Sequence, residues 1–231
     1  QNLTPIDAVK FACSYASWLK NKSKKKKLRI VIGRDGRISG KMIQNLVQNS
    51  IISLGIDVID LGLSTTPTVE IMIKNLQADG GIVITASHNP SDWNALKLLN
   101  KKGEFISDED GKKVIDMSLN YQFEFSKIND LGQVIEEPNS MIKHIDSVLK
   151  LEVINADAIR KTNLSVVVDG INSSGGIIIP LLLDKLNVKY QKIFCEPNGD
   201  FQHDPEPLGK NIIDLRNKVV QEKADLGIAV D

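Results

Sequence analysis

The sequence predicts an α/β protein built as two consecutive three-layer α/β/α domains with mainly parallel, mixed sheets. Three observations support this fold class. Short apolar runs typical of buried strands alternate along the chain with amphipathic helical patterns. The alternation loosens once, near the middle, and then resumes. The length of 231 residues suits one large or two small domains, and alternating strands and helices form parallel sheets covered by helices on both faces.

The first predicted helix has the clearest start signal. Thr4 can cap it, Pro5 suits its first position, and Asp7 lies in the first turn, where the helix dipole favours a carboxylate. Apolar side chains then recur at helical spacing: Ile6, Val9, Cys13, Ala16 and Leu19. We therefore expect a helix with one apolar face.

The rest of the first half follows the same alternation. Strands are expected at 28–32, 58–61, 81–85 and 95–99, and helices at 43–54, 67–76 and 108–119. Residues 121–137 show no firm period, and a helix from 140 to about 151 follows them. We place the domain boundary in this region, which gives a first domain of residues 1–138 and a second of residues 139–231.

The second half repeats the pattern. Strands are expected at 165–168, 188–194 and 226–230, and helices at 177–186 and 209–223. Pro180 is assigned to the first turn of its helix, where a missing N–H removes no hydrogen bond. His203, in the polar loop at 198–208, is interpreted as structural or solvated. The last strand ends in Asp231 with no element after it, so we interpret the chain as a fragment.

Composition argues against several function classes. The formal net charge is +0, which does not suit a general role on nucleic acid or on a membrane surface. The one basic cluster, four lysines at 24–27, fits a solvated loop before a strand. Cys13 and Cys195 give neither a disulfide framework nor metal-ligand spacing, and no secretory signal or membrane span is apparent. The two thiols fit a reducing environment, so we expect a cytoplasmic protein.

Ser87 is the most informative residue of the chain. Four predicted strands run into polar or glycine-rich turns, at Gly33, Thr85, Asp169 and Asp231. Ligands bind beyond such strand ends in open α/β sheets, and Ser87 follows one of them. A serine-hydrolase role is disfavoured, because Ser87 and His88 are sequence neighbours that point in opposite directions and no Gly-x-Ser-x-Gly motif is present.

Two interpretations of Ser87 remain open at this point. A phosphoryl carrier needs nearby cations and backbone donors, and Arg34, Arg37 and Lys97 would supply the cations if the strand ends converge. Alternatively, Ser87 caps its own turn and His88 bonds a backbone carbonyl. The local chemistry does not favour one interpretation over the other.

Four segments together resemble the α-D-phosphohexomutase family, which comprises phosphoglucomutase, phosphomannomutase and phosphoglucosamine mutase. The most specific is residues 81–99, GIVITASHNPSDWNALKLL, whose Thr-Ala-Ser-His-Asn-Pro core is similar to the active-site segment of that family. Three further segments match in the same order: 33–40, its Gly-x-Asp-x-Arg-x-Ser motif; 166–176, the strand and glycine turn that open its second domain; and 227–231, the strand before its metal loop. The resemblance covers essentially the whole chain.

The resemblance implies a reaction and a cofactor. Ser87 would be a phosphoserine that donates its phosphoryl group to a hexose phosphate, giving a bisphosphorylated sugar that returns its other phosphoryl group. Hexose 1-phosphate and 6-phosphate would thereby interconvert, with hexose 1,6-bisphosphate as activator. Mg²⁺ would be held by the phosphate on Ser87 and three aspartates, of which only Asp231 is present.

The resemblance also implies roles for the side chains around Ser87. Lys97 matches a general base or acid near the sugar hydroxyl, and Arg37 matches an arginine that lies close to the phosphoserine. His88 joins them as a catalytic candidate in the same loop. Asn89 and Arg34 are candidates for binding the sugar phosphate.

Departures from the family pattern limit these implications. Ala95 stands where glycine is usual, which is tolerable if that position needs no positive φ, and Gly36 stands where threonine is common. Two metal aspartates and the family's later, sugar-reading domains do not occur in these 231 residues. We expect this chain alone to be inactive, and we favour glucosamine or mannose phosphates over glucose phosphate as substrates. The alternative is a non-catalytic sugar-phosphate-binding fragment or module.

Overall fold

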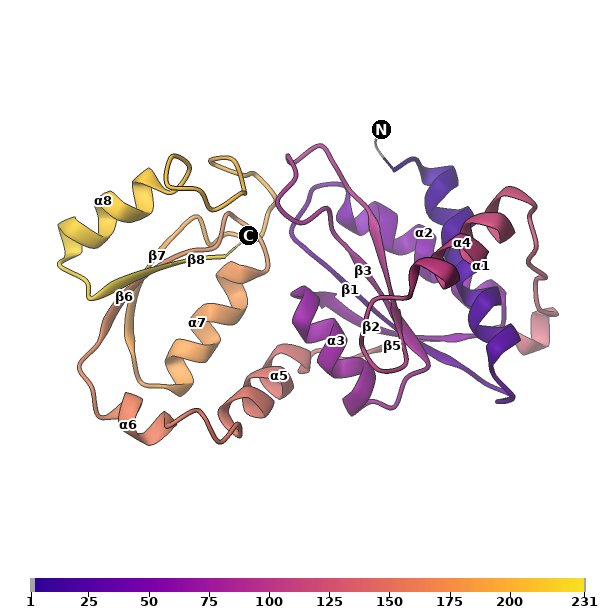
Figure 1. Ribbon diagram of the computed structural model, residues 1–231, viewed down its shortest axis with the longest axis horizontal. Helices are drawn as coiled ribbons and strands as arrows, with labels where there is room; N and C mark the ends of the chain where they lie inside the picture. The colour runs from indigo at the N-terminus through magenta and orange to yellow at the C-terminus, as the bar shows by residue number, and fades with distance from the viewer. Residues whose placement is uncertain (1–2, 231) are drawn as a thin grey trace. The chain divides into compact units, whose positions relative to one another are not determined.

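The computed structural model describes residues 3–230, which divide into two compact units (Figure 1). Unit 1 contains residues up to 34, 39–85 and 94–140. Unit 2 contains the residues from 141 onward together with two short loops, 35–38 and 86–93. The second unit therefore includes two loops that the first half of the chain contributes.

Unit 1 is built on a five-stranded sheet in the order β4-β3-β1-β2-β5. The strands are β1 (Arg29–Arg34), β2 (Asp57–Leu63), β3 (Gly80–Ile84), β4 (Leu96–Asn100) and β5 (Val134–Glu136). β4 runs antiparallel to β3, and all the other pairs are parallel. The carboxyl ends of β1 and β3 lie at one edge, and the chain leaves this edge into the loops 35–38 and 86–93.

Helices cover both faces of this sheet, because successive side chains of a strand point to opposite faces. The helices are α1 (Pro5–Lys22), α2 (Gly40–Ser53), α3 (Thr66–Asn75) and α4 (Asp108–Leu119). Ile30 and Ile32 of β1 belong to a buried core with α1, α2 and α4, while Val31 belongs to a separate core with α3 (Figure 1). The predicted α/β/α layering is confirmed in this unit.

The start of α1 follows its sequence signal. The side-chain oxygen of Thr4 accepts a hydrogen bond from the Asp7 N–H at 3.2 Å, and the Asp7 carboxylate accepts one from the Thr4 N–H at 3.1 Å. This reciprocal capping box satisfies two backbone donors at the helix start. The Thr4 hydroxyl also donates to the Asp7 carboxylate, and this bond, together with the bond from the Thr4 N–H, lowers the pKa of Asp7.

Unit 2 is built on a smaller parallel sheet in the order β7-β6-β8. Its strands are β6 (Ser165–Asp169), β7 (Lys189–Ile193) and β8 (Leu226–Ala229), and its helices are α5 (Ser140–Leu149), α6 (Ala156–Arg160), α7 (Gly175–Lys185) and α8 (Ile213–Glu222). Val166 and Val168 of β6 share a buried core with Leu183 of α7. Leu215 of α8 lies against Gly227 of β8.

Some predicted elements differ from the structure. α7 begins at Gly175, within the turn that the prediction kept separate, so Pro180 is its sixth residue and does not lie in the first turn. α8 begins at Ile213 and not at 209, because backbone hydrogen bonds form a turn at 208–212 first. The sequence analysis missed β5, whose three residues are all exposed, and α6, whose five residues are too few to show a period.

No helix among residues 3–230 combines the length and the apolar character that a membrane span requires.

Candidate functional site

Ser87 lies in the loop 86–93, which continues the chain beyond β3. Its φ is 55°, in the left-handed region that L-residues with a side chain seldom adopt. The side-chain and backbone nitrogens of Asn89 both donate to the Ala86 carbonyl, at 2.7 and 3.1 Å, and close the turn around Ser87. Ser87 is half-buried and His88 is exposed. Such a conformation persists only where surrounding contacts enforce it.

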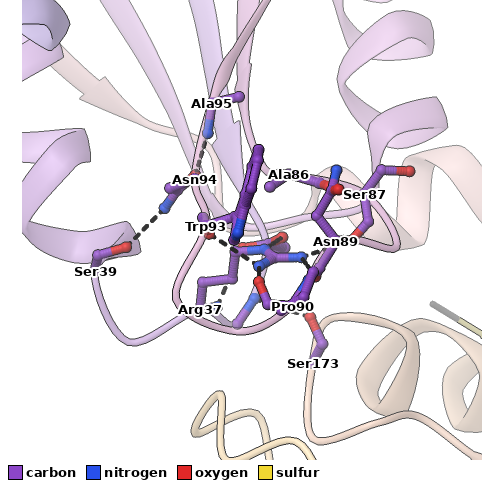
Figure 2. A network of polar contacts seen from close by, with 12 residues as sticks. Arg37, Ser39, Ala86, Ser87, Asn89, Pro90, Trp93, Asn94, Ala95 and Ser173 are labelled. Carbon is purple, nitrogen blue, oxygen red and sulfur yellow. Dashed lines mark hydrogen bonds and ion pairs between the residues drawn. The ribbon is translucent and has the colours of Figure 1, made fainter. Parts of the chain in front are cut away.

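Several of these contacts come from Arg37, whose side chain is fully buried (Figure 2). Its Nη2 donates to the carbonyl oxygens of Ser87 and Asn89, at 2.6 and 2.7 Å. Its Nη1 donates to the carbonyl oxygens of Pro90 and Trp93, the latter at 2.9 Å. One guanidinium therefore binds four backbone carbonyls of a single loop.

Asp35 completes the coordination of Arg37. The Arg37 Nε donates to Asp35 Oδ2 at 3.0 Å, and the Arg37 backbone N–H donates to Asp35 Oδ1 at 3.1 Å. The ion pair compensates a cation that would be costly to bury alone. The ring of Phe201 lies 5.2 Å from the guanidinium carbon. Because a guanidinium carries five N–H donors, Arg37 has none left for a further acceptor.

The loop 35–38 is in turn held by loops from the second half of the chain. The Gly36 N–H donates to the side-chain oxygen of Ser173 at 2.9 Å. The Gly199 N–H donates to the Asn172 carbonyl at 3.0 Å, and the Asn172 side chain donates to the Asp200 carbonyl at 2.8 Å. Gly199 has a φ of 76°, and a Cβ there would lie 2.3 Å from the Gly36 oxygen. Only glycine fits this contact.

Sequence reasoning missed Asp35, Asn172, Ser173 and Phe201. The polar turn after β6 was recognised as a site without a choice among its residues. A signal for Asn172 exists, since asparagine tolerates positive φ better than most residues, and its φ is 53°. The contact of Phe201 with the guanidinium has no sequence signal, because the two residues are far apart in the chain.

Asp169, at the end of β6, is 1% exposed and anchors the loop that carries His203. Asp169 Oδ2 lies 2.9 Å from His203 Nε2, and His203 Nδ1 lies 2.8 Å from the Asp204 carbonyl oxygen. Two acceptors facing both ring nitrogens suit an imidazolium. Burial opposes the charge, but the hydrogen bonds to Asp204 and Asp169 outweigh it and raise the pKa of His203.

Arg34 and Lys97 belong to unit 1. Arg34 ends β1, and its Nε donates to the Gln44 side-chain oxygen at 3.1 Å. Lys97 pairs with Val83 in the antiparallel ladder of β3 and β4, is half-buried, and forms no ion pair with any residue in 3–230. The structure thus brings Arg37, Ser87 and Asn89 together in unit 2, whereas Lys97 lies on β4 in unit 1.

Two further sequence expectations concern Ala95 and the Mg²⁺ site. Ala95 is absent from the positive-φ residues, so alanine is tolerated there as expected. Residues 3–230 contain no group of three or more His, Cys, Asp or Glu side chains placed to hold a metal. The predicted ligand Asp231 lies outside the described residues, so the Mg²⁺ site formed with Ser87 stays a prediction.

Models of known families match both halves of the chain. The model described as phosphoglucomutase/phosphomannomutase, alpha/beta/alpha domain I, matches residues 1–125, and that for domain II matches residues 142–231. A phosphoglucomutase/phosphomannomutase of Thermococcus kodakarensis is 34% identical over 100% of this chain and 50% of its own length. A phosphoglucosamine/phosphogalactosamine mutase of Sulfurisphaera tokodaii is 30% identical, with the same coverage. The chain spans about half the length of the curated relatives it matches.

Solved structures share the fold. A phosphoglucomutase/phosphomannomutase family protein from Burkholderia thailandensis superimposes with a TM-score of 0.80 at 23% identity, over 99% of this chain and 49% of that one. The parafusin phosphoglucomutase of Paramecium gives a TM-score of 0.74 at 19% identity, over 96% of this chain and 46% of that one. At these identities the likeness concerns the fold.

Proposed function

This chain belongs to the phosphoglucomutase/phosphomannomutase family, and on that premise we propose that it forms the phosphoserine-bearing part of a hexose-phosphate mutase. The carrying observation is the placement of Ser87. Its loop continues from a parallel strand beyond the carboxyl edge of the sheet, where α/β folds bind ligands. A buried arginine holds four carbonyls of that loop, so the serine is kept in one conformation.

The proposed reaction transfers a phosphoryl group in both directions. The bond between phosphorus and Ser87 Oγ breaks, a bond from phosphorus to a sugar hydroxyl oxygen forms, and the hydroxyl proton is balanced by a proton gained at Ser87 Oγ. The resulting bisphosphorylated sugar then returns its other phosphoryl group to Ser87. Positioning and charge compensation dominate the catalysis of such transfers, which agrees with a serine fixed through its backbone.

Lys97 is the proposed proton relay for the sugar hydroxyl. Its ammonium group has no carboxylate partner among residues 3–230, and its backbone is held in register with β3, the strand that leads to Ser87. His88 and Asn89 are proposed to shape the phosphoserine loop and contact phosphate, and Arg34 to bind substrate from the end of β1. The hydrogen bond from the Asn89 side chain to the Ala86 carbonyl closes the turn around Ser87 and supports the proposal that Asn89 shapes this loop.

Glucosamine and mannose phosphates are the proposed substrates, ahead of glucose phosphate. The relative from Sulfurisphaera is named a phosphoglucosamine/phosphogalactosamine mutase, which supports an amino-sugar phosphate, whereas the relative from Thermococcus is named a phosphoglucomutase/phosphomannomutase and so names glucose as well as mannose. Mg²⁺ and a hexose 1,6-bisphosphate activator belong to the same proposal. Among residues 3–230, no group of three or more His, Cys, Asp or Glu side chains is placed to hold the ion. Both cysteines are free, which supports a cytoplasmic location.

The experiment measures the phosphoryl group on Ser87. After incubation with glucose 1,6-bisphosphate, intact mass should show an adduct of about 80 Da, as expected for a phosphoserine. Ser87→Ala should lack the adduct, whereas Ser91→Ala, an exposed serine in the same loop, should keep it. The full-length protein should interconvert hexose 1- and 6-phosphates, and Ser87→Ala should abolish this activity.

Three results would contradict parts of the proposal. Full activity of Ser87→Ala would exclude the phosphoserine mechanism. Binding of sugar phosphates by the full-length protein without turnover or adduct would favour the non-catalytic module. Robust turnover by residues 1–231 alone would contradict the expectation that this chain is an inactive part.

A further inference from the structure

We propose that Arg37 is a positioning residue, which fixes the phosphoserine loop through its backbone and contributes no hydrogen bond to phosphate. The inference rests on the proposed function, because it assigns Arg37 a role toward Ser87. The family resemblance implies only that Arg37 lies close to the phosphoserine; the contacts of its guanidinium show what the side chain binds.

All five N–H groups of Arg37 already have protein acceptors: four backbone carbonyls of loop 86–93 and the carboxylate of Asp35. A phosphate oxygen could gain a hydrogen bond from Arg37 only if one of these acceptors lost its own. These bonds are partly buried and donated by a charged group, so breaking one of them costs more than breaking an ordinary hydrogen bond, and the exchange is unfavourable.

The surroundings of the guanidinium shield it from a substrate. Arg37 is 1% exposed, so no solvent-facing edge is available to a substrate. Its charge is compensated by the Asp35 carboxylate at 3.0 Å, and the Phe201 ring lies against the group. A neutralised and covered guanidinium exerts little attraction on a phosphate. These contacts instead suit a group that holds the protein's own backbone.

The hydrogen bonds from Arg37 also restrict the backbone of Ser87. The carbonyl oxygen of Ser87 accepts from Nη2 at 2.6 Å, and that of Asn89 accepts from the same nitrogen at 2.7 Å. Bonds on both sides of His88 restrict the turn in which Ser87 keeps its φ of 55°. The direction of the Ser87 hydroxyl thus depends on a planar fork of donors. A lysine, with three donors at one point, cannot reproduce that fork.

Loops from the second half of the chain contact the segment that carries Arg37. Gly36, next to Arg37, is bound by the Ser173 hydroxyl and is packed against Gly199. Ser173 and Gly199 belong to loops joined by the Asn172 hydrogen bonds. We therefore assign to these loops the support of the reactive serine, transmitted through Arg37.

The test compares Arg37→Ala and Arg37→Lys with Arg29→Ala in the full-length protein. Arg29 is a matched control, because its guanidinium also binds a backbone carbonyl, that of Leu76, but at the opposite end of β1. Misplacement of a reacting group typically costs about 100-fold in rate. We expect kcat of both Arg37 variants to fall by about that factor while KM changes by less than about threefold, and Arg29→Ala to keep its activity.

Chemical rescue separates positioning from general destabilisation. Guanidinium at millimolar concentration should restore part of kcat and of the Ser87 adduct in Arg37→Ala, whereas the same concentration of ethylammonium should not. A rise in KM with unchanged kcat, or equal rescue by both cations, would overturn the inference and assign Arg37 to phosphate binding or to bulk charge. Inactivity of Ser87→Ala keeps the proposed function intact in either case, so the two proposals fail separately.

A measurement on the wild-type protein tests the inference even if the Arg37 variants do not fold. In ¹⁵N spectra, the Arg37 Nη protons should exchange slowly with water, and their signals should move little when Ser87 becomes phosphorylated. A large shift of these signals on phosphorylation would contradict the inference, because it would show a phosphate oxygen replacing a carbonyl.

Discussion

The guanidinium of Arg37 donates a 2.6 Å hydrogen bond to the carbonyl oxygen of Ser87, and Ser87 is one of the few non-glycine residues with a left-handed backbone. The two facts are connected, since a residue in this region needs external bonds to stay there. The candidate nucleophile is thus held through its main-chain carbonyl, and Arg37 does not occupy the hydroxyl that would carry the phosphoryl group.

Replacing Ser87 by glycine and by alanine separates the hydroxyl from the backbone. Both variants should lose the phosphoryl adduct. Glycine adopts a φ of 55° without the penalty that a Cβ brings, so Ser87→Gly should be more stable than Ser87→Ala by about 1 kcal/mol. Urea unfolding of the two variants measures the difference. Equal stabilities would mean that the left-handed conformation does not persist in solution.

Gly199 should not tolerate a side chain. Ala at this position would combine a φ of 76° with a Cβ at 2.3 Å from the Gly36 oxygen. We expect Gly199→Ala to lower the free energy of unfolding by at least about 1–2 kcal/mol, and to weaken phosphorylation of Ser87. Gly209→Ala is the matched control, because nothing lies within 4 Å of a Cβ there. Similar melting temperatures for the two variants would refute the close contact between the loops.

His203 should make stability depend on pH. Because its pKa is raised in the folded protein, the protonated form stabilises the fold fully below the unfolded pKa of about 6.5, and this contribution is lost as pH rises through the folded pKa. His203→Gln should cost about 1–3 kcal/mol at pH 5.5, as expected for a hydrogen bond to a charged group. The cost should shrink by pH 8.5. Chemical denaturation at both pH values tests this, and a cost that grows with pH would reverse the assignment.

Much of the fold could be predicted from local patterns. Apolar runs located β1 to β4 and β6 to β8, and the Thr4–Asp7 capping box located the start of α1, because these signals depend on neighbours in sequence. Elements without such signals were missed. β5, for example, is an exposed edge strand. The start of α7 was also misplaced: the helix begins at Gly175, earlier than the polar turn suggested, so Pro180 lies inside it.

The candidate site divides in the same way. The motif around Ser87 singled out this residue, and the family resemblance predicted that Arg37 lies close to it; the Arg37 guanidinium is bonded to the Ser87 carbonyl. Arg34 and Lys97, the other cations expected near Ser87, belong to unit 1, and their role toward Ser87 stays a prediction. The acceptor that each Arg37 N–H group binds could not be predicted from the sequence. The sequence around Arg37 would read the same whether its guanidinium faced a phosphate or four backbone carbonyls.

The sequence by itself determined the alternation of strands and helices and the family, because hydrophobic period and motif order are properties of the linear chain. Only the tertiary structure decided that Arg37 faces the backbone of loop 86–93 and that Asn172, Ser173 and Gly199 support it. Those contacts join residues far apart in sequence, and their energies depend on burial and on exact donor directions. Neither quantity exists until the chain has folded.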